Sequence, residues 1–569
     1  MYNNNNNFKL PISYLKNSFK IDHHIIDDLN LYNFDNDDES IATYNLLFDN
    51  SNNHLSNKTI ELWTKHFTND ITFLKNTQSL LKKQFSLTTS SFQDISSIWD
   101  NIHTEQNHFI DKYHYIDLSW LQFLNNNILF LQVLSTYNLT SPLITLAMPI
   151  FMIIMPFFIL KLKGQSITFT DYFNVLAIVF SQHQIGQLFN FMNVSWDQKV
   201  YIVISVSFYV LQIYQNINSC YHFFTNLKNI HNELFTVRNF IAQSSSYMNE
   251  FYHKTRKLKS YKPFRNDIKK HVNTLQDFNK SLFNIHPYEL SLKKFYNLGT
   301  VMYCYYQLYK SSSIYNSLDF SIHFMGYYDN LALLRCQISK KNLSFCSFTN
   351  KNTDFKNAYS STILHTKPIP NSYALNKQLL ITGPNAAGKT TLLKTTLINI
   401  ILSQQLGIGF YSSANIHPYD FIHCYINIPD TSERDSLFQA EARRCKNIID
   451  TINSNSNLRH FCIFDELYSG TNPYEAVASA AAFLKYLNSY PNVSYIITTH
   501  FLHLCDTLDK DASTRNCHME TIGANKDIKY TYRLCDGISK IKGGTKVLHD
   551  LDYPKEILSS AEDLINNIN

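Results

Sequence analysis

Glycine and cysteine are scarce in this 569-residue chain, and where they fall is informative. Only 13 residues are glycine, and nine of these lie at or after Gly383. Because glycine serves mainly in turns, this predicts a helical N-terminal part and a turn-rich α/β C-terminal part, with a boundary near residue 345. The ten cysteines all lie at or after Cys220 and form no C-x-x-C pair. That pattern argues against a zinc ribbon or a disulfide framework and favours a reducing intracellular compartment.

The chain also lacks a strong charge excess and a secretory leader. Lys plus Arg number 50 against 45 Asp plus Glu, a formal net charge of +5 spread over a long chain. Global charge therefore implies no nucleic-acid partner, and such a signal has to be local. The first twenty residues contain an Asn run but no charged head followed by an apolar core, so we do not expect secretion.

The N-terminal part divides by composition. Residues 1–58, with Asn tracts and an acidic patch, are expected to be a weakly ordered lead-in with short helices. Residues 59–344 are expected to be helical, beginning with an amphipathic helix from Ile60 to about Leu87. Two stripes of apolar residues at four-three spacing predict paired helices that form an antiparallel arm: Phe223, Leu227, Ile230, Leu234, Val237 and Ile241, then Ile268, Val272, Leu275, Phe278, Leu282 and Ile285.

Two segments, 142–160 and 200–214, are almost wholly apolar. No charged residue lies between Leu118 and Leu160, and the first segment is about as long as a bilayer-spanning helix. A helical hairpin buried in a soluble core would have the same composition. Prolines at 142, 149 and 156 favour membrane insertion, because membrane helices tolerate proline better than long soluble helices do. Both interpretations stay open, and the protein is expected to be intracellular with membrane association as one option.

A basic arm spans residues 252–271. Eight Lys or Arg residues stand there against one acid, Asp267, with Tyr252, Tyr261 and Phe264 between them. The arm suits contact with nucleic-acid phosphates, but a solvated hairpin tip or a lipid-headgroup contact explains it equally well.

The sequence from Gln378 to Thr391, QLLITGPNAAGKTT, reads as strand, loop and helix in the order of a phosphate-binding loop. The loop amides and the helix N-terminus supply positive dipole, and Lys389 adds a mobile charge for the β- and γ-phosphates of ATP. The residues expected to bind the nucleotide are Gly383, Pro384, Asn385, Ala386, Ala387, Gly388, Lys389, Thr390 and Thr391.

Two later strands end in residues that an ATPase needs. The run from Phe461 to Phe464 precedes Asp465 and Glu466. We expect Asp465 and Thr390 to position Mg²⁺ and Glu466 to polarise the attacking water. A further strand ends at His500, which is a candidate sensor of the γ-phosphate.

In order and spacing these motifs resemble the MutS family of ATPases. The resemblance rests on GPNAAGKTT, on Gln405-Leu406-Gly407, on the S-x-F-x-x-E element from Ser436 to Glu441, on Asp465-Glu466 with Gly470-Thr471, on Thr499-His500, and on a similar tail around Tyr532 and Tyr553. It implies an ABC-type ATPase domain over residues 345–569, acting as a homodimer in which Ser436 reaches the nucleotide of the partner chain. The first 140 residues contain no Phe-x-Glu wedge and are too few for the family's mismatch-reading domain and a connector.

Two functions from different classes follow. In the first, a dimer of the MutS type binds mismatched or branched DNA, and ATP hydrolysis changes its conformation. In the second, a membrane-anchored ABC-type ATPase acts on a lipid or protein partner.

Overall fold

The computed structural model forms two compact units. The first contains residues 1–91, 247–270 and 319–569, and the second contains residues 92–246 and 271–318. The residues that the structure describes are 8–32, 42–48, 54–88, 93–104, 109–162, 164, 168–182, 186, 188, 191–193, 195–286, 288, 295–361, 368–426, 428, 437–509, 511–523, 529–539, 541, 548–549 and 551–567.

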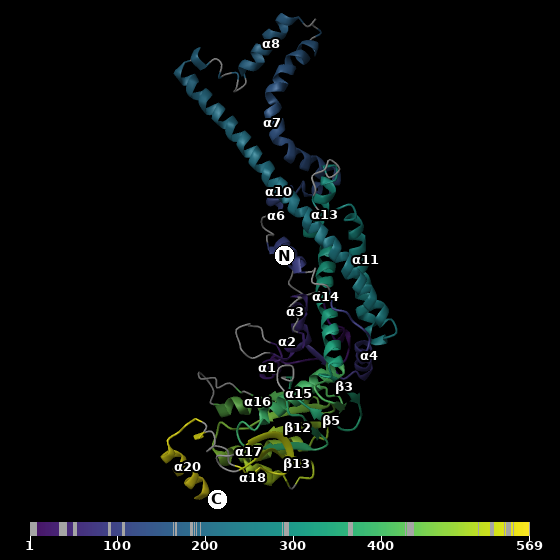
Figure 1. The fold of residues 1–569 in the computed structure, drawn as a ribbon, viewed down its shortest axis with the longest axis vertical. Helices are drawn as coiled ribbons and strands as arrows, with labels where there is room; N and C mark the ends of the chain where they lie inside the picture. Colours follow the sequence, from purple (N-terminus) through teal and green to yellow (C-terminus); the bar gives the residue numbers. More distant parts are fainter. Residues whose placement is uncertain are drawn as a thin grey trace. The chain divides into compact units, whose positions relative to one another are not determined.

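A six-stranded sheet forms the centre of the first unit (Figure 1). Its strand order is β10-β11-β12-β7-β13-β14; β14 runs antiparallel to β13, and the other neighbours are parallel. Parallel neighbours require crossover connections, which explains why helices follow β7, β10, β11 and β12. The strands are β7 (Gln378–Thr382), β10 (Phe421–Tyr425), β11 (His460–Asp465), β12 (Val493–Thr498), β13 (Thr514–Ile522) and β14 (Lys529–Asp536).

Helices α16, α17 and α18 cover one face of this sheet. Cys462, Phe464 and Ile497 point into the core shared with them, whereas Phe461, Ile463 and Ile496 alternate to the opposite side and are equally buried. Alternate residues of one strand are therefore buried on both faces, as a parallel sheet requires. The helices of this part are α15 (Lys389–Leu406), α16 (Leu437–Ser454), α17 (Pro473–Asn488), α18 (Leu502–Leu508) and α20 (Lys555–Asn567).

Two of the three smaller sheets among the described residues lie in this part of the chain, and β1 and β2 form the third. Strand β3 pairs with β8, and a four-stranded sheet has the order β4-β9-β5-β6. These elements begin near residue 344, directly after helix α14 (Ser312–Ser339), close to the boundary expected from glycine usage. Their bounds are β3 (Ser344–Phe345), β4 (Ser347–Phe348), β5 (Asp354–Ala358), β6 (Asn371–Ala374), β8 (Ile408–Gly409) and β9 (Ser413–Ile416).

The described N-terminal residues differ from the weakly ordered lead-in expected for 1–58. They form short elements of the first unit, and Phe8, Leu10, Tyr44 and Phe48 are buried. The helix expected from Ile60 to Leu87 is two helices separated by strand β2, with Asp70 capping the second by accepting a hydrogen bond from the N–H of Phe73 at 3.0 Å. The elements are η1 (Pro11–Tyr14), β1 (Ser18–Lys20), α1 (His23–Asp28), α2 (Thr43–Phe48), α3 (His54–Trp63), β2 (His66–Thr68) and α4 (Ile71–Leu81).

The second unit is helical. Both predicted apolar stripes, on α10 and α11, are buried throughout. The guanidinium of Arg238 on α10 donates to the carbonyl of Ile285 just after α11 at 2.8 Å, so the chain returns alongside α10. The described elements lying wholly or partly in this unit are α5 (Gln93–Thr104), α6 (Phe109–Lys112), η3 (Gln122–Asn126), α7 (Ile128–Leu162), α8 (Phe169–Gln182), η4 (Phe191–Asn193), α10 (Trp196–Thr255), α11 (Lys262–Ser281), α13 (Leu298–Lys310) and the first turns of α14 (Ser312–Ser339). The short helix η5 (Lys259–Tyr261) joins α10 to α11 in the first unit.

Both apolar segments singled out in the sequence are helical. Segment 142–160 lies in α7, although the side chains of residues 148–150 and 152 fall outside the described set, and segment 200–214 lies in α10. Among the described residues, α10 is long and apolar enough to cross a membrane, and Ile153–Leu162 and Phe169–Ser181 are shorter apolar helical stretches.

Candidate nucleotide site

The phosphate-binding sequence forms the loop between β7 and α15. Gly388 begins the helix with φ of 92°, a left-handed conformation, and a Cβ there would lie 3.1 Å from the ring of Tyr532. Ala386 is also left-handed, with φ of 63°. Alternation of backbone conformation in such a loop turns successive N–H groups toward one point, which creates an anion-binding concavity.

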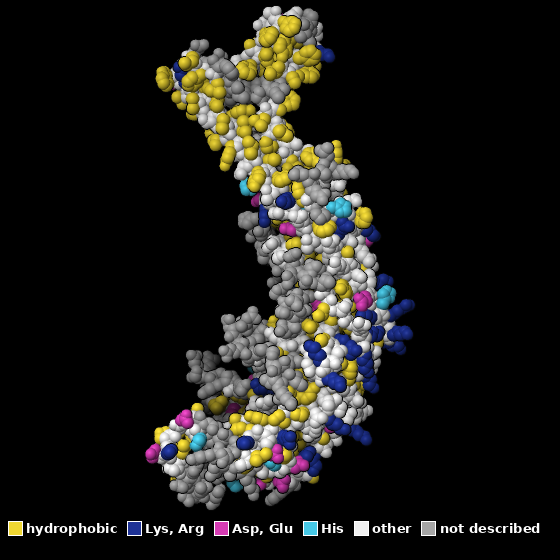
Figure 2. Space-filling model, in the orientation of Figure 1, with side chains coloured by type: hydrophobic (Ala, Val, Ile, Leu, Met, Phe, Trp, Pro, Cys, Tyr) yellow, Lys and Arg dark blue, Asp and Glu magenta, His cyan; other side chains and the backbone are white. Residues whose placement is uncertain are grey.

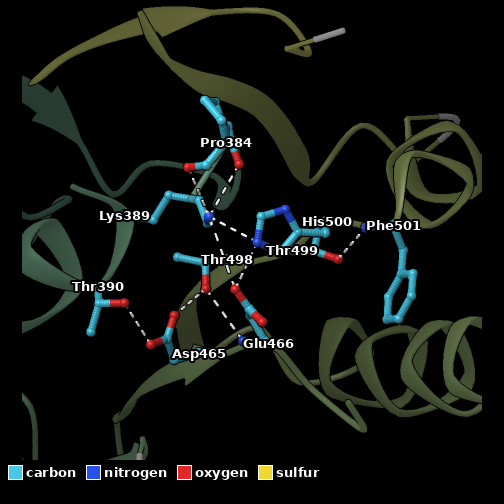
Figure 3. A network of polar contacts seen from close by, with 10 residues as sticks. Pro384, Lys389, Thr390, Asp465, Glu466, Thr498, Thr499, His500 and Phe501 are labelled. Carbon is cyan, nitrogen blue, oxygen red and sulfur yellow. Dashed lines mark hydrogen bonds and ion pairs between the residues drawn. The ribbon is translucent and has the colours of Figure 1, made fainter. Parts of the chain in front are cut away.

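The side chain of Lys389 is buried and folds back over the loop. Its Nζ donates to the carbonyls of Gly383 at 3.1 Å and Pro384 at 3.3 Å, and it lies 3.9 Å from Oε1 of Glu466 (Figure 3). Burial lowers the pKa of the Lys389 ammonium below its usual value, while the carboxylates of Glu466 and Asp465 oppose that shift. The ammonium is thus held among oxygen atoms at the position where phosphate oxygens would compete for it.

Asp465, at the end of β11, meets two hydroxyl groups. Oγ1 of Thr390 donates to Oδ2 of Asp465 at 2.7 Å, and the hydroxyl of Thr498 on β12 donates to Oδ1 (Figure 3). Thr498 also accepts from the N–H of Glu466 at 3.3 Å, which fixes the turn after β11. Carboxylate and hydroxyl oxygens are hard ligands of the kind that Mg²⁺ prefers, so this pair of residues fits the ion.

Glu466 and His500 form the other half of the cluster. Nε2 of His500 lies 2.9 Å from Oε1 of Glu466 and 3.0 Å from Nζ of Lys389. The hydrogen bond with His500 holds the pKa of the Glu466 carboxyl below its usual value, against an opposing effect of partial burial. Glu466 therefore stays ionised at neutral pH, which suits a group that polarises water.

A cavity of about 670 Å³ lies over the loop and is lined by Asn385, Lys389, Thr390, Glu466 and Tyr532, among others. That volume lies within the usual range for small-molecule sites. Tyr359 and Ile369, which carry no sequence motif, add an aromatic and an apolar wall. The expected loop residue Thr391 also lines the cavity, and Pro384 lies beneath Lys389.

Sequence reasoning gave no role to Glu441 or Thr498. Glu441, the last residue of the S-x-F-x-x-E element, accepts from the N–H and hydroxyl of Ser469 at 3.1 and 3.0 Å and from the N–H of Gly470 at 3.2 Å. It thereby holds the segment that follows Glu466. Glu441 is part of the S-x-F-x-x-E element, and Thr498 directly precedes Thr499-His500, so the sequence indicated both positions. It did not indicate the hydrogen bonds that these two residues make. Ser436 lies outside the described residues.

The basic arm has a different character from the one expected. Tyr261 and Phe264 are buried, so neither can stack on a base. Lys254 pairs with Glu250 at 2.5 Å and lies over the ring of Phe85 at 4.3 Å, and Arg265 donates to the carbonyl of Leu258 at 2.7 Å. The other six basic residues are exposed, and we define the exposed basic patch by five of them: Arg256, Lys257, Lys259, Lys262 and Lys269.

Comparison with known proteins gives matches to the C-terminal part. Residues 379–569 match the family model of MutS domain V. DNA mismatch repair protein MutS of Streptococcus pyogenes serotype M5 (strain Manfredo) and that of serotype M49 (strain NZ131) are each 27% identical over 204 residues. That region is 35% of this chain and 24% of each relative, so the alignment spans about a quarter of the length of these relatives.

Proposed function

We propose, from the membership of its C-terminal part in the MutS family, that this protein is an ATP-hydrolysing, DNA-binding protein of the MutS type. In this proposal it binds mismatched or branched DNA as a homodimer, and ATP hydrolysis in its ABC-type domain drives a change of conformation. The observation that carries the proposal is the convergence of Lys389, Thr390, Asp465, Glu466 and His500 at the ends of three parallel strands (Figure 3).

Each residue of the cluster has a role that its contacts support. Lys389 and the amides of residues 385–390 bind the phosphates of ATP. Thr390 and Asp465 hold Mg²⁺, which when bound supplies positive charge to those phosphates. Glu466 accepts a proton from, or orients, the attacking water, and His500 bridges Glu466 to the γ-phosphate. Resemblance to the family supports a role for Ser436 at the nucleotide of the partner chain.

The exposed basic patch is the proposed contact with DNA. Its five members are exposed in the segment between α10 and α11 and on the first eight residues of α11. Figure 2 shows Lys and Arg side chains gathered over this part of the surface. Side chains of this kind bind backbone phosphates irrespective of base sequence, so DNA structure rather than sequence would be recognised here.

Two variants test the ATPase assignment. Lys389→Ala removes the charge that faces the phosphates, so ATP binding should be lost. Glu466→Gln keeps the shape of the side chain and removes only the group that activates water, so ATP should still bind while hydrolysis falls by at least about 100-fold. Binding is measured with a fluorescent ATP analogue, and hydrolysis by phosphate release. Equal loss of binding in both variants would contradict these roles.

The DNA assignment is tested by stimulation of hydrolysis. Purified protein is assayed with homoduplex DNA, with the same duplex carrying one mismatch, and with a four-way junction. Higher ATPase activity with the mismatched or branched DNA than with homoduplex is the expected result. Activity that does not respond to any of the three would remove DNA as the partner while leaving the nucleotide site intact.

A second candidate function, a membrane-anchored ATPase acting on a lipid or protein partner, is favoured by the exposed apolar helices of the second unit. These helices are developed below.

A further inference from the structure

An apolar hairpin is the most distinctive surface of the second unit. We define it as residues 137–162 of α7, helix α8, and residues 196–221 of α10. Figure 2 shows hydrophobic side chains gathered over these helices. Apolar side chains that are at least half exposed lie on all three helices, among them Leu143 and Leu146 on α7, Phe169 and Phe173 on α8, and Tyr201 and Phe208 on α10.

A buried core does not account for this hairpin. In the most apolar 18-residue stretch of α10 only 6% is buried within the protein. Soluble monomers rarely expose continuous apolar patches of more than a few hundred Å². Of the two interpretations left open by the sequence, the described residues therefore contradict burial inside this chain.

Backbone groups in the hairpin are satisfied from within. A proline at 149 has no N–H for the carbonyl of Thr145, and that carbonyl accepts from the hydroxyl of Tyr209 on α10 at 3.3 Å. Pro142 likewise leaves the carbonyl of Asn138 without its helical donor, and the hydroxyl of Ser141 donates to it at 3.3 Å. In hydrocarbon, where no water is available, freed carbonyls need such internal donors.

Two polar side chains of α10 bond to α7 as well, although Nδ2 of Asn138 on α7 is buried without a partner. Nδ2 of Asn216 donates to Oγ1 of Thr145 at 2.8 Å, and Sγ of Cys220 donates to the carbonyl of Leu139 at 3.3 Å. These bonds place α7 and α10 side by side and turn their polar groups toward each other. The surface left outside is mainly apolar; the exposed polar side chains on residues 200–221 of α10 are Ser207 and, toward the tyrosine end, Gln212, Gln215, Asn218 and Ser219.

Charge is confined to one end of the hairpin. The only Asp, Glu, Lys or Arg residues between Leu118 and Leu227 are Lys161, Lys163, Asp171, Asp197 and Lys199, all at or between the far ends of α7 and α10. Lys161 lies 6.0 Å from the ring centre of Phe157, and Lys199 lies 5.6 Å from that of Trp196, whose side chain is 80% exposed. Lysine with tryptophan or another aromatic ring is typical of a membrane–water interface.

Exposed tyrosines mark the other end. Tyr137 on α7 and Tyr221 on α10 lie at the same level, because Cys220 bonds to Leu139. At about 1.5 Å per residue, the helix from Tyr137 to Phe157 is about 30 Å long, and that from Tyr221 to Lys199 is about 33 Å long. Both values match a hydrocarbon core of about 30 Å.

We propose that the apolar hairpin inserts into a lipid bilayer. Helices α7 and α10 cross the hydrocarbon region side by side, and their tyrosine ends lie at the interface from which both enter. Helix α8, about 21 Å long, is too short to cross. It lies with its charged flanks at the far interface.

The experiment places a polarity-sensitive label at chosen depths of the full-length chain. Leu146→Cys and Phe208→Cys carry the fluorophore NBD in the hairpin. Phe283→Cys is the matched control, since Phe283 is an exposed aromatic residue of the same unit outside the hairpin. The background chain has serine at the native cysteines that are not buried, Cys220, Cys336 and Cys535.

Vesicles of phosphatidylcholine and phosphatidylglycerol are the probe. On reconstitution, NBD at 146 and 208 should brighten several-fold, shift to the blue, and be quenched by lipids brominated in mid-chain, whereas NBD at 283 should change little. Native protein should also stay in the membrane pellet after an alkaline carbonate wash, and the double variant Leu146→Arg, Phe208→Arg should be released into the supernatant, unlike Phe283→Arg. Release of the native protein, or labels at 146 and 208 that are equally blue-shifted without lipid, would overturn the proposal; the second result would indicate a protein occupant.

This inference does not depend on the nucleotide site. ATPase activity measured in the same vesicles reports on that site separately, and the released Arg variant should hydrolyse ATP if the first unit is intact. Loss of hydrolysis with unchanged NBD signals would count against the proposed function alone.

Discussion

Gln405 allows a direct test of how the N-terminal segment is held against the C-terminal α/β part of the first unit. It is the next-to-last residue of α15 and is 2% exposed, and its Nε2 donates to the carbonyls of Trp63 at 2.7 Å and His66 at 2.8 Å. Its Oε1 accepts from the hydroxyl of Tyr44. Trp63 is the last residue of α3, so the amide satisfies a carbonyl that has no helical donor. One side chain thus joins three N-terminal elements to the helix that follows the phosphate loop.

The substitution Gln405→Ala leaves these buried groups without partners. Each unsatisfied buried group costs about 1–3 kcal/mol, and water entering the vacated space recovers part of that, so we expect a loss of about 3 kcal/mol in unfolding free energy. Such a loss should lower Tm by at least several degrees.

The assay is thermal unfolding followed by intrinsic fluorescence, with limited proteolysis to locate the weakened segment. Gln276→Ala, at an exposed position on α11, is the matched control and should leave Tm within about one degree. Cleavage should become faster within residues 42–81. If Gln405→Ala unfolds at the same temperature as the control, the hydrogen bonds of the Gln405 amide do not stabilise the packing of the N-terminal segment against α15.

Three further predictions concern the basic patch, the N-terminal helix α1 and the dimer. Replacing four members of the exposed basic patch with Ala should lower the slope of log affinity for DNA against log salt by about 0.9 for each DNA phosphate that is no longer neutralised, whereas Lys254→Ala should lower Tm and leave the slope unchanged; equal slopes in all proteins would exclude the patch. Burial raises the pKa of the Asp28 carboxyl to about 6 in the folded protein. The folded state therefore binds this proton more tightly than the unfolded state does, and the stability that results is lost as pH rises through that value. Asp28→Asn should therefore raise Tm at about pH 8 and have little effect at about pH 4, and a pH-independent difference would refute the reasoning. If Ser436 serves the partner's nucleotide, mixing Lys389→Ala and Ser436→Ala chains should restore ATPase activity, because one site of the mixed dimer then carries neither lesion; no rescue despite subunit exchange would exclude the composite site.

The residues of the nucleotide site could be named from the sequence because each motif is local. A strand that ends in a short functional loop is visible in ten residues, and parallel strands bring their carboxyl ends to one edge. The order β11-β12-β7, which brings Asp465 near Thr390, is set by which strands pair over long distances. The contacts of Thr498 and Glu441 depend on that order, so no local pattern could predict them.

The N-terminal segment shows the opposite case. Its Asn tracts and acidic patch indicate little burial, yet Tyr44 and Phe48 are buried. Phe48 stacks on Trp63, but the hydroxyl of Tyr44 bonds to Gln405, more than 300 residues away. Composition describes how much apolar surface a segment can offer, but not whether a distant part of the chain will cover it.

Helix α15 and the apolar hairpin both show that the polarity of a segment does not by itself decide whether it is buried. Helix α15 carries Thr396, Asn399, Ser403, Gln404 and Gln405, and all five are buried. The first three bond to Tyr373, Phe410 and Tyr411, and the two glutamines bond to the N-terminal segment. The hairpin is far more apolar, yet most of its surface is exposed. Whether a surface of this chain is buried therefore depends on whether another part of the chain packs against it, and not on its hydropathy. An apolar surface that its own chain does not cover needs another apolar medium, and the distance of about 30 Å between its aromatic ends matches that of a bilayer.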